Sequence, residues 1–151
     1  MDLDPEWRPK VAERLLPEEE EREGKKYLLK LSFKMIKFKS LNQSKDFLKI
    51  LKKKRVNTKY FTIYFDKNLT NLNKYLNISF VMKKNIGNAV IRNKVKRKLR
   101  SAVQKNFNEK NVINLNYTYV IFGKNNVYKD KFANVLNEVK ETFKKINKVG
   151  A

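Results

Sequence analysis

The chain has 151 residues, and its 36 Lys and Arg outnumber its 15 Asp and Glu, giving a formal charge of +21; histidine and cysteine are absent. A strongly basic protein attracts nucleic acid or an anionic membrane, whereas the lack of cysteine excludes disulfides, thiolate catalysis and cysteine-based metal sites. No apolar run approaches the roughly 18 to 20 residues that a membrane-spanning helix needs. We therefore expect a soluble, intracellular protein with a polyanionic partner.

The charge is distributed unevenly along the chain. Residues 1–26 hold nine acidic and six basic side chains, and the other 125 residues hold 30 basic and six acidic ones. All three prolines lie within the first 17 residues, and this composition is typical of a flexible tail. We expect residues 1–26 to be a disordered extension or leader, or alternatively a polyanion mimic that covers the basic surface. Residues 27–151 are expected to form one basic domain.

Two elements are expected at the start of this domain. In residues 28–38, apolar side chains alternate loosely with lysines, which predicts a strand or an extended basic arm. Ser44 is a candidate N-cap for a helix that ends near Lys53. The apolar stripe of that helix consists of Phe47, Ile50 and Leu51.

Two strands are expected next. Residues 60–65 and 76–82 are rich in aromatic and β-branched side chains, which favour strands. The Asn-rich residues 66–74 between them are expected to connect the two strands as a hairpin.

A turn at Gly87 then leads into a helix that ends near Phe107 and has two different faces. On one face, apolar side chains recur at steps of three and four residues, which predicts packing against a core; they are Ile91, Val95, Leu99, Ala102 and Val103. On another face, Arg92, Lys96 and Arg100 lie four residues apart, with Asn93 and Arg97 beside them.

The basic face favours a phosphate-rich partner. Like charges four residues apart on a helix repel each other, so this face needs a polyanion or full solvation. Asn93 adds no charge, but its amide both donates and accepts hydrogen bonds. We interpret the mixture as a surface for phosphates that also contacts ribose or base edges.

The C-terminal part predicts one more strand and one more helix. Residues 117–122 form the strand, which Gly123 ends, and residues 130–148 form the helix. The apolar face of this helix consists of Phe132, Val135, Leu136, Val139, Phe143 and Ile146. The predicted order is α-β-β-α-β-α, an α/β chain with a small mixed sheet of about four strands and three helices packed on it.

These residues resemble the protein subunit of bacterial ribonuclease P. That family has a Gly-Asn/Lys-Ala-Val segment followed by an Arg-Asn-Arg-x-Lys-Arg-x-x-Arg helix, matched here by residues 87–90 and 92–100. The resemblance spans about residues 35–148 and includes residues 45–47 and 60–64. Lys94 replaces the usual arginine, which keeps the charge but loses the bidentate fork.

The resemblance implies a fold and a function. The fold is an α+β two-layer sandwich with a left-handed βαβ crossover through the basic helix, against the usual right-handed rule. The function is removal of the 5′ leader from precursor tRNA by a cytoplasmic ribonucleoprotein endonuclease of a bacterium or organelle. Its RNA subunit is catalytic, and Mg²⁺ is bound mainly by that RNA and the substrate. This chain is then the non-catalytic subunit, which binds ribonuclease P RNA and the leader and aids substrate and Mg²⁺ binding.

Two groups of RNA-contacting residues are expected. The RNA-binding group consists of Lys83, Lys84, Arg92, Asn93, Lys94, Lys96, Arg97 and Arg100. The resemblance implies a cleft between the sheet and the first helix in which the leader stacks on aromatic side chains; these are Phe47, Phe61 and Tyr64. Phe47 and Phe61 are equally candidates for the core. No catalytic or metal-binding residue is expected, because the basic domain has no histidine and only six scattered acidic residues.

Two other function classes remain open from the sequence. A ribosomal or general RNA-binding protein would share the size and the charge. A DNA-binding regulator would place the basic helix in a major groove. A cognate RNA that restores cleavage of precursor tRNA would distinguish ribonuclease P from both.

Overall fold

The computed structural model describes residues 36–68, 75–109 and 111–150. In chain order the elements are β1 (Phe38–Lys39), α3 (Ser44–Leu51), β2 (Lys54–Asn57), β3 (Phe61–Lys67), β4 (Leu76–Met82), the short 3-10 helix η1 (Lys84–Ile86), α4 (Ala89–Phe107), β5 (Tyr117–Gly123), α5 (Asn126–Lys129) and α6 (Phe132–Gly150). The tail predicted for residues 1–26 and most of the strand or arm predicted for 28–38 lie outside the described residues.

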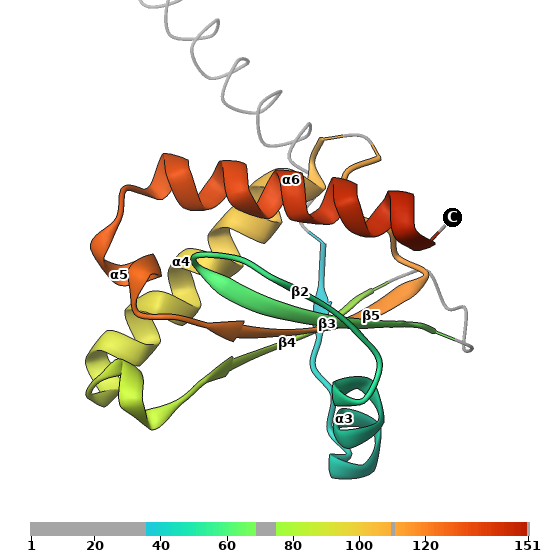
Figure 1. The fold of residues 1–151 in the computed structure, drawn as a ribbon, viewed down its shortest axis with the longest axis horizontal. Coiled ribbons are helices and arrows are strands. Elements are labelled where there is room, and N and C mark those ends of the chain that lie inside the picture. The colour runs from blue at the N-terminus through green and yellow to red at the C-terminus, as the bar shows by residue number, and fades with distance from the viewer. Residues whose placement is uncertain (1–35, 69–74, 110, 151) are drawn as a thin grey trace, which may run out of the picture. The chain divides into compact units, whose positions relative to one another are not determined.

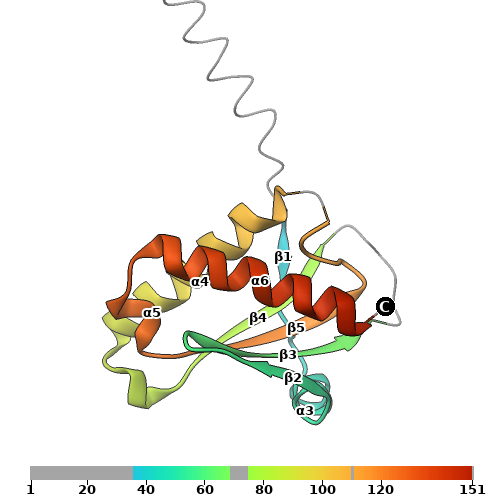
Figure 2. The same ribbon diagram turned by 45° about the horizontal axis from the view of Figure 1, so that its top comes forward.

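The strands form one mixed sheet in the order β1-β4-β5-β3-β2. Strand β4 is parallel to both β1 and β5, whereas β3 is antiparallel to β5 and β2. Helices α4 and α6 lie on one face of the sheet and α3 on the other (Figures 1 and 2). Because α4 connects the neighbouring parallel strands β4 and β5, the three form a βαβ unit; its left-handed sense stays a prediction.

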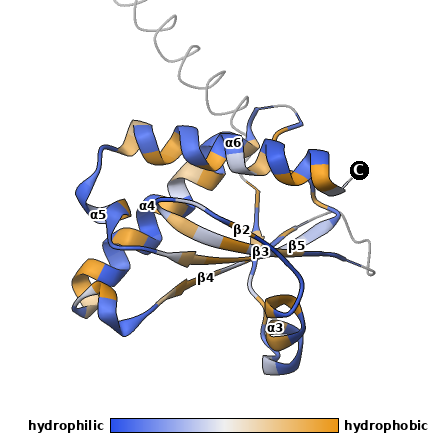
Figure 3. Ribbon diagram, viewed as in Figure 1, coloured by the Kyte–Doolittle hydropathy of each residue, from blue (hydrophilic) through white to orange (hydrophobic). Residues whose placement is uncertain are grey.

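Alternation along the strands separates the two faces of the sheet. In β3 the side chains of Phe61, Ile63 and Phe65 are buried, and those between them are half-buried. The buried row packs in one core cluster with the apolar stripes of α4 and α6. Figure 3 shows these helices as alternating apolar and polar bands. The predicted helix stripes are therefore confirmed.

The predicted fold class is confirmed as α/β, with five strands and four α-helices in the described residues rather than about four and three. The sequence prediction missed β2 because its exposed, basic residues look like a loop; such residues are common on edge strands. It also missed the single-turn helix α5. The predicted hairpin is wrong, because β5 lies between β3 and β4 and these two strands do not pair. Residues 69–74 of that connection lie outside the described residues.

The residues just before α4 and α3 determine how these two helices begin. Gly87 has a φ of 145°, a conformation that side chains with a Cβ rarely adopt, and it turns the chain into α4. Asn88 then caps α4, since its Oδ1 accepts a hydrogen bond from the Ile91 amide at 3.0 Å. In α3 the N-cap is Gln43, without a side-chain capping bond, so the prediction of Ser44 as N-cap is wrong.

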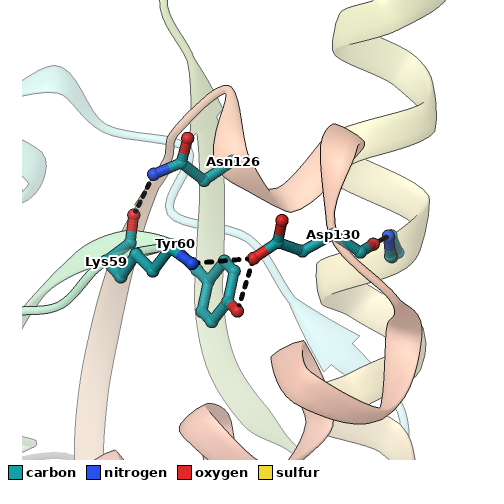
Figure 4. Close-up of polar contacts among 5 residues, drawn as sticks. Lys59, Tyr60, Asn126 and Asp130 are labelled. Atoms are coloured by element: carbon teal, nitrogen blue, oxygen red, sulfur yellow. Dashed lines mark hydrogen bonds and ion pairs between the residues drawn. The ribbon is translucent and has the colours of Figure 1, made fainter.

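Asp130 joins three segments at one end of the sheet (Figure 4). Its Oδ2 accepts hydrogen bonds from the Tyr60 hydroxyl at 2.7 Å and from Lys59 Nζ at 3.0 Å. Its backbone carbonyl accepts a bond from Lys98 of α4. The Asn126 amide also donates to the Lys59 carbonyl at 3.2 Å. These bonds hold the turn before β3, the segment after α5 and the middle of α4 together.

Asp130→Asn is expected to lower the melting temperature near neutral pH and to flatten its pH dependence below about pH 4. The hydrogen bonds from Tyr60 and Lys59 hold the pKa of Asp130 below its ordinary value of 3.8. A carboxylate with a lowered folded-state pKa stabilises the fold above the unfolded pKa, and this contribution is lost as pH falls through the folded pKa. Thermal melts of both proteins over about pH 2.5 to 7 check this; parallel melting profiles across that range would contradict it.

Candidate RNA interface

Burial determines which way the side chains of α4 point. Val95 and Leu99 are completely buried, Ala102 and Val103 continue the stripe, and Ile91 is half-buried against the core. The apolar face predicted for this helix is confirmed. The remaining side chains of the motif therefore leave the helix on its other sides.

Five polar side chains of α4 lie within about 140° of one another around the helix axis, as calculated from 3.6 residues per turn. We call this surface the basic side of α4; it consists of Arg92, Asn93, Lys96, Arg97 and Arg100. It borders strands β4 and β1: Arg92 and Lys96 share a pocket with Phe80 of β4. The Arg100 guanidinium lies 5.0 Å from the centre of the Phe38 ring of β1, within range of a cation–π interaction.

The charge on this side is not balanced within the described part of the chain. Among the described residues, the ion pairs are formed by lysines outside α4 with nearby carboxylates; these lysines are Lys49, Lys53, Lys59, Lys140 and Lys144. Four cations close together on one helix side repel each other. A polyanion bound along α4 would remove this repulsion.

Lys94 points in a different direction from the basic side. Its Nζ lies 5.9 Å from the centre of the Tyr128 ring of α5. Lys98, one turn further along, bonds to the Asp130 carbonyl. The sequence grouped Lys94 with the other motif cations, but the structure places it toward α5.

A second site, the Phe122 cleft, lies on the sheet face that carries α3. The Phe122 ring of β5 is 6.2 Å from Phe47 of α3 and 5.6 Å from Tyr64 of β3, measured between ring centres. Lys83 Nζ lies 5.9 Å from the centre of the same ring. A cavity of about 240 Å³ next to it is lined by Thr62, Lys83, Asn85, Ile86, Phe122, Gly123, Lys124 and Asn125. The site therefore combines half-buried aromatic rings with lysines.

The structure brings together two of the three aromatic residues predicted for the leader cleft. Phe47 and Tyr64 both pack against Phe122. Phe61 has 0 % of its surface exposed and belongs to the core under α4 and α6. Its assignment to the cleft is corrected, because neighbouring residues of a strand point to opposite faces and Phe61 has the other parity from Tyr64.

Sequence reasoning missed Phe122. Its strand is apolar along nearly its whole length and buried on both faces, so no alternation indicated which face each residue takes. Phe122 must point to the opposite face from its neighbours Ile121 and Gly123. Which of the two faces forms the cleft could be decided only from the pairing of the strands. The two predicted lysines before the turn also separate: Lys83 joins the Phe122 cleft, and Lys84 is exposed at the start of η1.

Comparison with known proteins decides between the function classes. The family model described as Ribonuclease P matches residues 35–147. The chain belongs to the ribonuclease P protein family. The ribonuclease P protein component of Mycoplasma mycoides subsp. mycoides is 34 % identical over 94 residues, which are 62 % of this chain and 82 % of that protein. The resemblance seen in the sequence is confirmed, and the ribosomal and DNA-regulator alternatives are set aside.

Two solved structures of ribonuclease P proteins are similar to this one. The protein from Thermotoga maritima has 27 % identity and a TM-score of 0.59, over 71 % of this chain and 96 % of that one. The protein from Staphylococcus aureus has 25 % identity and a TM-score of 0.54, over 73 % and 95 %. The chain is thus the protein component of the ribonuclease P holoenzyme, which matures the 5′ end of tRNA, and its family implies ribonuclease P RNA as partner.

Two further properties concern the described residues alone. None of their helices is long and apolar enough to cross a membrane. They also contain no group of three His, Cys, Asp or Glu side chains placed to hold a metal ion.

Proposed function

We propose that the basic domain, residues 27–151, binds two RNAs on opposite faces of its sheet. The basic side of α4 is assigned to ribonuclease P RNA, and the Phe122 cleft to the 5′ leader of precursor tRNA. The observation that carries this proposal is the separation of the two sites: one is a row of cations that form no ion pair within the described part of the chain, and the other is a cluster of aromatic rings with lysines.

The chemistry of each site fits its assigned RNA. A row of cations neutralises phosphates without reading sequence, which suits the backbone of a structured RNA. Aromatic side chains stack on unpaired bases of any sequence, which suits a single-stranded leader that differs between precursors. Lys83 beside Phe122 supplies a charge for the leader backbone.

The protein's part in the reaction is electrostatic. Its cations reduce the repulsion between the phosphates of the two RNAs and so strengthen binding of the substrate. Mg²⁺ is held mainly by the RNA subunit and the substrate, and weaker repulsion between the RNAs lowers the Mg²⁺ concentration that they need. This assembly acts in the cytoplasm of a bacterium or in the interior of an organelle.

A reconstituted holoenzyme tests the proposal. The protein alone is expected not to cleave precursor tRNA, whereas with ribonuclease P RNA it should allow cleavage at a Mg²⁺ concentration too low for that RNA alone. In this holoenzyme, Phe122→Ala should weaken binding of leader-bearing precursor by roughly 1 to 3 kcal/mol, the contribution of one stacked base. Affinity for mature tRNA should stay unchanged, because mature tRNA has no leader.

Phe122→Tyr is the matched control, since it keeps the aromatic ring and should bind the leader normally. Cleavage by protein free of RNA would overturn the assigned division of labour. Equal loss of affinity for precursor and mature tRNA in Phe122→Ala would show that the leader does not lie in the Phe122 cleft.

A further inference from the structure

A second pocket lies between the basic side of α4 and strand β4. Its volume is about 240 Å³, and it is lined by Phe80, Met82, Ala89, Arg92, Asn93 and Lys96. The residues Phe80 and Met82 of β4 pack at the border of the core cluster under α4. This pocket therefore lies on the opposite sheet face from the Phe122 cleft.

The apolar wall of the pocket has a defined position. The Phe80 ring packs edge-on against Phe38, with ring centres 6.2 Å apart and planes at 74°. The Arg100 guanidinium covers Phe38 in turn. Because Phe80 is held by this packing and by the core, it presents a fixed aromatic surface to the pocket.

The opposite wall is polar and has an unfilled hydrogen-bonding capacity. The Nε of Arg92 is buried and has no hydrogen-bond partner among the described residues. Leaving a buried donor unpaired is unfavourable, and because Arg92 lines the pocket, a shift of its side chain toward an acceptor there would remove this cost. Asn93 adds an exposed amide that both donates and accepts.

Groups that favour a phosphate stand at the rim. Lys96 is exposed, and Ala89 belongs to the first turn of α4, where the helix dipole and the free amides attract anions. The pocket thus combines an aromatic side chain with hydrogen-bond donors, an acceptor and a lysine. Proteins that recognise unpaired RNA use this combination, stacking the base and hydrogen-bonding its edge.

We propose that this pocket receives one unstacked nucleobase of ribonuclease P RNA. The base lies against Phe80 and Met82, its edge meets Arg92 and Asn93, and its phosphate lies beside Lys96. The inference rests on the proposed binding of ribonuclease P RNA to α4, and it adds an insertion point to what is otherwise a contact with the RNA backbone. The source is the RNA subunit rather than the leader, because the leader is assigned to the other face of the sheet.

Phe80→Ala tests the insertion of the base without changing the charge of the protein. Binding of ribonuclease P RNA to the full chain should weaken about tenfold, within the range that loss of one stacked base produces. The slope of affinity against salt should stay unchanged, because no phosphate contact is removed. In chemical probing of 2′-hydroxyl reactivity, one unpaired nucleotide should respond to the wild-type protein and lose that response with Phe80→Ala.

Two other variants keep the test decisive. Phe132→Ala is the matched control: Phe132 is also a partly buried ring next to an α4 lysine, Lys105, at 4.9 Å, but it does not line the pocket, so RNA affinity should not change. Asn93→Ala removes an exposed side chain, so the fold persists, and it should weaken binding severalfold with an unchanged salt slope.

The outcomes separate this inference from the function on which it rests. If loss of the cations on α4 weakens RNA binding while folded Phe80→Ala and Asn93→Ala bind normally, the pocket proposal is overturned and the proposed function stands. If loss of those cations has no effect, the proposed function itself fails. If Phe80→Ala weakens binding of the precursor leader but not of ribonuclease P RNA, the occupant is the leader and the proposal is wrong.

Discussion

Leu99→Ala is expected to lower the free energy of unfolding by about 2 to 5 kcal/mol, the range for a large-to-small change at a buried site. Leu99 is fully buried in the middle of α4, the helix that packs on both the sheet and α6. The substitution removes apolar contacts and leaves a cavity between these layers. RNA affinity should fall only as far as the folded fraction falls. Urea unfolding followed by circular dichroism measures the first effect, and filter binding below the transition measures the second.

Lys96→Ala on the same helix is the control, less than one turn away. Lys96 is exposed, and exposed substitutions usually change stability by under about 0.5 kcal/mol. Relief of repulsion from Arg92 and Arg100 should even stabilise the free protein slightly. If Lys96→Ala unfolded the protein while Leu99→Ala did not, the orientation of α4 described here would be wrong.

The faces of α4 could be predicted because a helix repeats its pattern several times. Five apolar positions at steps of three and four residues gave one consistent orientation, and Val95, Leu99 and Val103 are buried as expected. Once that stripe is fixed, the helical period alone places Arg92, Lys96 and Arg100 on another side. The same argument succeeded for α6.

The sheet could be predicted less completely because its order depends on distant pairings. Residues 61–67 and 76–82 follow each other in the chain, yet β5, about 40 residues later, lies between them. Local patterns contain no information on such an insertion. Strand β2 was missed for another reason: among the described strands it pairs only with β3, and its outward side chains are those of a solvated loop.

The candidate site shows the same contrast: features that follow from the local sequence could be predicted, and features that depend on distant strand pairings could not. The composition of the basic motif predicted an RNA-binding helix, but not that Lys94 turns toward Tyr128. The leader cleft needed the parity of two strands, so Phe61 was left open between the cleft and the core, and Phe122 was missed. Phe47 and Tyr64 were identified through the family resemblance, and only the three-dimensional fold shows that both contact the ring of Phe122.

The largest effect on RNA binding is expected from removing three cations of the basic side together. At roughly 1 kcal/mol for each lost RNA contact, the variant Arg92→Ala/Lys96→Ala/Arg100→Ala should bind ribonuclease P RNA about a hundredfold more weakly. The slope of log affinity against log salt should become shallower by about two to three units, because Lys96 and Arg100 are expected to contact phosphates and Arg92 also meets a base edge. Filter binding over a series of salt concentrations measures both quantities.

A charge-matched control separates direct contact from the field of the whole protein. Lys144→Ala/Lys145→Ala/Lys148→Ala removes the same three charges from exposed positions of α6, so both variants have the same net charge. Long-range attraction is screened within about 8 to 10 Å at physiological salt, and the α6 variant should therefore lose far less affinity and keep most of the salt slope. Equal losses in the two variants would mean that total charge, rather than the row of cations on α4, determines RNA binding.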